Sequence, residues 1–140
     1  MRVAIGGLFW EEEATGSGQY TRHLVRELLT LQEDEYILFR RRNGEKDPGR
    51  RERLPHRHLP TPFPPSSNLS KLWFEQISFP QACRGVDVAH VPYFAPPLFP
   101  SVPTVVTIHD LIPLVLPANR GCLFVHLYTR LVSLAAKRTT

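Results

Sequence analysis

The sequence predicts an α/β domain whose helices cover both faces of a mostly parallel, doubly wound sheet. Short β-prone runs alternate along the chain with longer segments of helical periodicity, which is typical of repeated strand–helix units. The run 104–108 is β-branched and apolar on both faces, as expected for a central parallel strand. The 140 residues, 42% of them hydrophobic, are enough for one domain with a buried core.

In the first part of the chain, two expected strands flank a long helix. Residues 2–5 are a short β-prone run that ends at a pair of glycines, which is a turn signal. From Gln19 onward apolar residues recur at helical spacing. Ser17 is the expected N-cap, because its hydroxyl can accept hydrogen bonds from amides of the first turn. Residues 36–39 are the second expected strand.

The rest of the chain continues the alternation of strands and helices. A weak strand signal at 56–59 precedes an expected helix that is capped by Asn68. Strands are expected at 86–90 and 104–108, and helical periodicity returns between about 121 and 137. This order favours parallel pairing, since parallel strands need crossover connections.

Residues 40–66 form a basic, proline-rich segment that we expect to be a solvated loop. It holds eight basic and three acidic side chains, while the whole chain has a net charge of +4. Such a segment can attract nucleic acid or anionic lipid. Its one aromatic residue is Phe63, and it contains no recognised nucleic-acid motif, so no nucleic-acid partner is expected.

Several classes of protein are disfavoured by composition. The apolar runs are far shorter than the ~20 residues that span a bilayer, and the N-terminus lacks the apolar region of a signal peptide. Cys83 and Cys122 are too few for a disulfide scaffold or a cysteine-rich zinc site. We therefore expect a cytoplasmic protein without a metal or cofactor.

Ligands of open α/β sheets bind beyond the carboxyl ends of the strands, where the chain places a glycine-rich segment. Gly16, Ser17, Gly18 and Gln19 precede the first helix, and amides at a helix start favour phosphate. Thr21 stands where a dinucleotide fingerprint has its third glycine, so an ordinary dinucleotide site is not expected. A flexible glycine turn is the alternative.

Two further candidates follow the later strands. His109 and Asp110 end the run 104–108, and a histidine there can donate a hydrogen bond or titrate near neutrality. His90 and Tyr93 follow the strand before it and could form part of a ligand-binding wall. A structural role remains the alternative for both pairs. No second histidine or cysteine stands near His109 at metal-ligand spacing.

Five blocks along the chain carry a family resemblance. In order, they are Met1-Arg2-Val3-Ala4-Ile5, Thr15-Gly16-Ser17-Gly18-Gln19-Tyr20-Thr21-Arg22-His23-Leu24, Leu72-Trp73-Phe74-Glu75-Gln76, Asp87-Val88-Ala89-His90-Val91-Pro92 and Val106-Thr107-Ile108-His109-Asp110-Leu111-Ile112-Pro113. Together they resemble the large GT-B family of retaining, nucleotide-sugar-dependent glycosyltransferases, which includes bacterial mannosyl- and glucosyltransferases. Gly6 departs from it, since many relatives carry Asp or Asn there.

The resemblance implies two Rossmann-like halves that face each other across a cleft. Residues 1–140 correspond to an incomplete N-terminal, acceptor-side domain, and the C-terminal donor-binding domain is absent. The implied partners are a nucleotide-sugar donor and a sugar or lipid-linked acceptor, with weak contact to an anionic membrane at its inner face. We expect the 140-residue chain alone to be inactive.

The resemblance also implies roles for individual residues. The segment from Gly16 to Gln19 would lie against the donor diphosphate or the acceptor, and His109 would face the transferred sugar. Asp110 would shape its loop, while His90 and Tyr93 would line the acceptor side. Gly18 and His109 should then meet at one rim. The alternatives are a non-catalytic module that holds a phosphate-bearing ligand or partner, and an anionic-surface or nucleic-acid binder that uses the basic segment.

Overall fold

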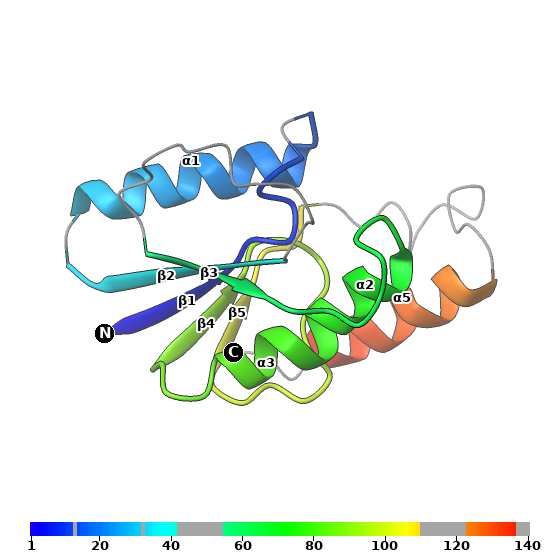
Figure 1. The fold of residues 1–140 in the computed structure, drawn as a ribbon. Coiled ribbons are helices and arrows are strands. Elements are labelled where there is room, and N and C mark those ends of the chain that lie inside the picture. Colours follow the sequence, from blue (N-terminus) through cyan, green and yellow to red (C-terminus); the bar gives the residue numbers. More distant parts are fainter. Residues whose placement is uncertain (13, 32, 42–54, 110–122, 137–140) are drawn as a thin grey trace.

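A computed structural model describes residues 1–12, 14–31, 33–41, 55–109 and 123–136 (Figure 1). Its centre is a five-stranded sheet in which every pairing is parallel, in the order β3-β2-β1-β4-β5. The strands are β1 (Arg2–Gly6), β2 (Glu35–Arg41), β3 (His56–Leu59), β4 (Val88–Val91) and β5 (Thr104–Val106). The predicted α/β class with a doubly wound parallel sheet is confirmed.

The strand order places a topological switch point beside β1. The chain moves outward from β1 to β2 and β3, then returns to the other side of β1 for β4 and β5. Ala4 of β1 pairs with Ile37 of β2 and with Ala89 of β4. Crevices open at such points, beyond the carboxyl ends of the strands, because the connections leave in opposite directions.

Helices cover both faces of this sheet. They are α1 (Gly16–Leu31), α2 (Asn68–Trp73), the π-helical η1 (Phe74–Ser78), α3 (Phe79–Ala82) and α5 (Leu123–Ala136). Helix α1 lies over one face, while α2 and α3 lie over the other, with α5 beside α2 (Figure 1). Side chains alternate between these layers: Ile5 and Leu38 belong to the core under α1, and Ala4 and Phe39 to the core on the opposite face.

Both predicted N-caps are wrong by one or two positions. Helix α1 begins at Gly16, and Thr15 caps it: the Gly18 amide donates to Thr15 Oγ1 at 3.1 Å. Ser17 therefore lies within the first turn. Helix α2 is capped by Ser67, whose hydroxyl accepts from the backbone of its third residue, and Asn68 is already helical. In each case the hydroxyl that precedes the turn satisfies an otherwise unpaired amide.

The expectation of a solvated loop over 40–66 is wrong for residues 40, 41 and 56–59, which belong to strands. Arg40 and Arg41 continue β2 and are buried, because they pair with His58 and Leu59 of β3. The weak strand signal at 56–59 is confirmed as β3. Residues 42–54 lie outside the described residues.

Strand β5 is shorter and more peripheral than its sequence predicts. It ends at Val106 rather than at 108, and it pairs with β4 alone, at one edge of the described sheet. Val105 is 46% exposed, as expected for a strand covered on one face. β-branched residues also suit such half-buried strands, so composition could not distinguish the edge from the centre.

Helix α1 approaches the turn before it so closely that one position excludes a side chain. A Cβ on Gly18 would stand 2.3 Å from the Glu12 carbonyl oxygen and 2.6 Å from that of Phe9. A Cβ on Gly16, two residues earlier, would have no other atom within 4 Å. The two glycines therefore have different roles, and only Gly18 sets the position of the helix.

Replacing Gly18 by alanine should destabilise the protein by about 2 kcal/mol, because backbone atoms must move to admit the methyl group. Gly16→Ala is the matched control and should change stability by no more than about 1 kcal/mol, since alanine favours a helix and meets open space. Urea unfolding of the two variants checks this. Equal losses would show that close approach at Gly18 does not matter.

Candidate functional site

Four side chains meet at the carboxyl edge of the sheet, from α1, from β4 and from the segment that follows β5. We call them the rim cluster: Tyr20, His90, Thr107 and His109. Thr107, directly after β5, has its hydroxyl 2.9 Å from His90 Nε2 and 3.4 Å from the hydroxyl of Tyr20. Helix α1 is thereby tied to the ends of β4 and β5. Burial lowers the pKa of His90, which keeps its ring neutral at pH 7.

His109 is held on two sides within the rim cluster. Its ring meets that of Tyr20 edge to face, with centroids 4.7 Å apart and an interplanar angle of 78°. Its Nε2 lies 3.1 Å from the carbonyl oxygen of Pro92. A carbonyl can only accept, so Nε2 carries a proton, and Nδ1 is the ring nitrogen that could act as an acceptor. His109 is therefore arranged to accept a hydrogen bond from a hydroxyl group.

The glycine-rich segment and His109 lie at the same edge of the sheet. Tyr20 stands two residues after Gly18 and touches the His109 ring directly. Segments about ninety residues apart in sequence are thus brought to one rim. Asp110, the other predicted residue of the His-Asp pair, lies outside the described residues.

The four residues of the glycine-rich segment differ in what they can offer a ligand. The Gly18 amide is taken by Thr15 Oγ1, and the Gln19 amide donates to the Thr15 carbonyl at 3.0 Å. Within the described part of the chain, the amides of Gly16 and Ser17 have no partner. A ligand at the start of α1 would therefore meet these two amides rather than that of Gly18.

Tyr93 lies inside the core rather than on an open wall. Its side chain is 3% exposed and packs edge to face against Phe9, with ring centroids 5.1 Å apart. Burial raises the pKa of its hydroxyl well above the usual value. A Cβ on Gly6 would stand 3.3 Å from that hydroxyl, so the glycine leaves room for it.

A second group of polar side chains, which sequence reasoning missed, lies on the α2 face of the sheet. We call it the polar cluster: Glu12, Arg41, Lys71, Glu75 and Tyr128. Glu75 belongs to η1 and is buried, and its Oε2 accepts a hydrogen bond from the Tyr128 hydroxyl of α5. Desolvation raises the pKa of Glu75 to about 7, although Tyr128, Lys71 and Arg41 each act in the opposite direction.

Lys71 connects α2 to the turn before α1. Its ammonium lies 3.4 Å from Glu12 Oε1 and 5.4 Å from the centroid of the Phe9 ring. The signal available in the sequence was Glu75 itself, a charged residue between apolar positions of a helix. Its placement in a π-helical turn is also notable, because such turns occur frequently at functional sites.

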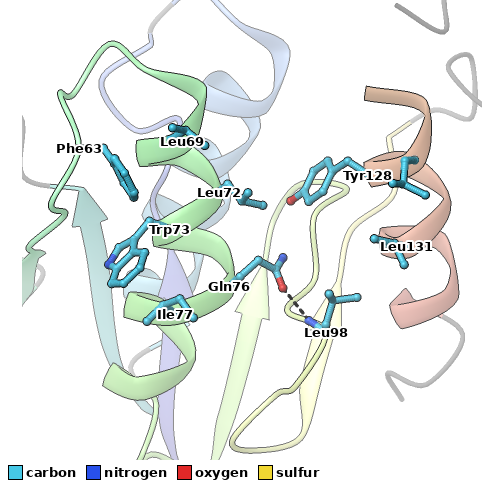
Figure 2. Close-up of a pocket in the computed structure, with 10 residues that line it drawn as sticks. Phe63, Leu69, Leu72, Trp73, Gln76, Ile77, Leu98, Tyr128 and Leu131 are labelled. Atoms are coloured by element: carbon cyan, nitrogen blue, oxygen red, sulfur yellow. Dashed lines mark hydrogen bonds between the residues drawn. The ribbon is translucent and has the colours of Figure 1, made fainter. Parts of the chain in front are cut away.

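An apolar groove runs between α5 and the helices α2 and η1 (Figure 2). Its volume is about 460 Å³. It is lined by Phe63, Leu69, Leu72, Trp73, Gln76, Ile77, Leu98, Leu127, Tyr128 and Leu131. Gln76 fixes one wall, since it accepts from the Leu98 amide at 2.9 Å and donates to the Pro96 carbonyl at 3.4 Å. Tyr128 belongs both to this groove and to the polar cluster.

Comparison with protein-family models matches residues 14–139 to Glycosyltransferase Family 4. The match covers most of the chain, and the chain belongs to this family. The searches of curated proteins and of solved structures each gave no match.

Two further findings concern only the described residues. None of their helices is both long and apolar enough to cross a bilayer. They also contain no group of three histidine, cysteine, aspartate or glutamate side chains that could hold a metal ion.

The polar cluster should make stability depend on pH through Glu75. The folded protein holds the Glu75 proton up to about pH 7, whereas the unfolded chain releases it near 4.5, so stability falls as pH rises through this window. Glu75→Gln, which stays neutral, should match the wild type at pH 5 and exceed its unfolding free energy at pH 8 by about 3 kcal/mol.

Denaturant unfolding at both pH values measures this difference. Glu27→Gln, a change at an exposed position of α1, is the matched control and should leave the pH dependence unaltered. If Glu75→Gln had the same pH dependence as the wild type, Glu75 would be ionised in the folded protein at pH 7.

Proposed function

We propose that the chain is the acceptor-side part of an enzyme that transfers a hexose from a nucleotide-sugar donor to an acceptor with retention. Family membership supports sugar transfer in general. The observation that carries the proposal is the contact between Tyr20 and His109, because it joins the start of α1 to His109 beside the switch point. Ligands of open α/β sheets bind at this position.

The start of α1 suits the donor diphosphate. As the bond to the sugar breaks, negative charge accumulates on the departing phosphate. The Gly16 and Ser17 amides, together with the positive end of the helix dipole, would stabilise that charge. This role requires no metal ion from the chain.

His109 suits the transferred sugar. Because Nε2 is engaged with Pro92, the free Nδ1 would accept a hydrogen bond from a sugar hydroxyl. The Tyr20 ring would keep the imidazole in place, so the sugar would be oriented for attack from the face that the diphosphate leaves. Among the residues that the structure describes, the rim cluster contains no carboxylate or thiol that could act as a nucleophile, which favours a mechanism without a glycosyl-enzyme intermediate.

We assign the acceptor to the α2 face of the sheet, opposite the start of α1 where the donor diphosphate would bind. A sugar or a lipid-linked sugar would fit this assignment, and the apolar lining of the groove favours the lipid-linked one. Such an acceptor would place the enzyme at the inner face of a membrane. Arg40 is buried and paired with Glu11, which removes one positive charge from the segment that could have bound nucleic acid.

His109→Ala in the intact enzyme should lower turnover by about 100-fold or more, because the sugar loses a fixed hydrogen-bond partner in the transition state. His109→Asn should retain more activity, since its amide oxygen takes about the place of Nδ1. His23→Ala, at an exposed histidine of α1, is the control.

The measurement is steady-state transfer from nucleotide sugars, with circular dichroism to establish that each variant is folded. Wild-type turnover in the His109→Ala enzyme would contradict the assigned role.

A further inference from the structure

Arg41 is a buried cation with unsatisfied donors. Arg41 is 9% exposed. Within the described part of the chain, its Nε and Nη1 atoms have no hydrogen-bond partner. Desolvation lowers the pKa of its guanidinium, although Glu12 and Glu75 act in the opposite direction. Buried arginines are ordinarily paired, because an unpaired charge loses the solvation that water gave it.

The two carboxylates that act on Arg41 have other partners. Glu12 binds the Lys71 ammonium, and Glu75 accepts from the Tyr128 hydroxyl. The neighbouring Arg40 contrasts with Arg41, since it points to the other face of β2 and donates to Glu11 Oε1 at 2.8 Å. The fold thus satisfies one of two adjacent arginines with a carboxylate and leaves the other without one.

We propose that Arg41, together with Lys71 of the same polar cluster, forms an oxyanion site that binds the phosphate group of a phosphate ester. The planar guanidinium can donate two parallel hydrogen bonds to two oxygens of one phosphate. The lysine ammonium does not offer this bidentate geometry. Lys71 shares both carboxylate neighbours of Arg41, which places a second positive charge in the same cluster.

The location of the site indicates which substrate would carry the phosphate. Arg41 is the last residue of β2, so it lies at the carboxyl edge of the sheet, on the α2 face. The start of α1 is on the other face and is assigned to the donor diphosphate. The phosphate at Arg41 would then belong to the acceptor, an assignment that rests on the proposed function, whereas oxyanion binding itself does not.

Glu75 should control the affinity of this site. It is buried in the same cluster as Arg41, Lys71, Glu12 and Tyr128, and its charge also helps to raise the pKa of the buried Tyr93 hydroxyl. Protonation of Glu75 removes a negative charge that competes with the anion. Sulfate is a suitable probe because it stays a dianion, so any change in its affinity between pH 8.5 and 6 reflects the protein.

The test measures sulfate binding to the protein by calorimetry and by thermal shift, with sodium chloride replacing sulfate at constant ionic strength. Wild type should bind sulfate, at least about threefold more tightly at pH 6 than at pH 8.5. Arg41→Met should bind about tenfold more weakly or not at all, while keeping its stability in sulfate-free buffer. Arg57→Met, at an exposed arginine of β3, is the matched control and should bind normally.

A second variant keeps the test decisive if Arg41→Met does not fold. Lys71→Met frees Glu12 to pair with Arg41, so sulfate affinity should fall about tenfold here too. No sulfate binding by the wild type, or wild-type affinity in the folded Arg41 variant, overturns the proposal. If Arg41→Met is instead less stable without changing sulfate binding, the residue serves only as a countercharge for Glu12 and Glu75, and the proposal is wrong.

The source of the phosphate is distinguished by competition with sulfate. Glycerol 3-phosphate competes if the site takes a free phosphate ester, and phosphatidylcholine vesicles that contain phosphatidic acid compete if it takes a lipid headgroup. Vesicles of phosphatidylcholine alone are the control. The His109→Ala protein should bind sulfate as the wild type does, so failure of the sugar-transfer proposal and failure of this one give different results.

Discussion

The geometry of the rim depends on a backbone contact that only glycine permits. The carbonyl oxygens of Phe9 and Glu12 approach Gly18 more closely than any side chain could tolerate. This contact, with the Thr15 cap, fixes where α1 begins and therefore where Tyr20 points. Because Tyr20 touches His109, the position of a turn near the N-terminus determines the orientation of an imidazole about ninety residues later. Glycine at this position thus serves packing, and its benefit to a ligand is indirect.

The architecture was predictable because it depends on patterns repeated over many residues. Alternating strand and helix periodicity predicts parallel pairing, and the observed sheet is parallel throughout. Boundaries depend on single hydrogen bonds, which such patterns do not resolve. Thr15 and Ser17 are both good caps in isolation, and the turn geometry selects Thr15. Arg40 and Arg41 are polar in sequence, yet pairing with β3 extends the strand through them.

Residues of the candidate site could be predicted only where a chemically reactive side chain directly follows a predicted strand. His109 stands at such an end, so its location at the rim could be expected. The polar cluster could not, because it joins residues from four separate segments. Glu75 is 53 residues from Tyr128, and nothing in the sequence of either segment identifies the other as its partner. Burial then moves the pKa of Glu75 toward neutrality, a property that belongs to the assembled fold alone.

Gly6 shows how a departure from a family pattern can be compensated in space. Many enzymes that this chain resembles carry Asp or Asn at this position, at the carboxyl end of the central strand. Here a Cβ on Gly6 would stand 3.3 Å from the Tyr93 hydroxyl and 3.6 Å from the His90 carbonyl oxygen. The Tyr93 hydroxyl therefore occupies space that a side chain from residue 6 would enter. Because that hydroxyl is buried and resists ionisation, it supplies a neutral polar group in place of a carboxylate or an amide. The space beside Gly6 is thus filled inside the core by a polar group that comes from residue 93 rather than from β1.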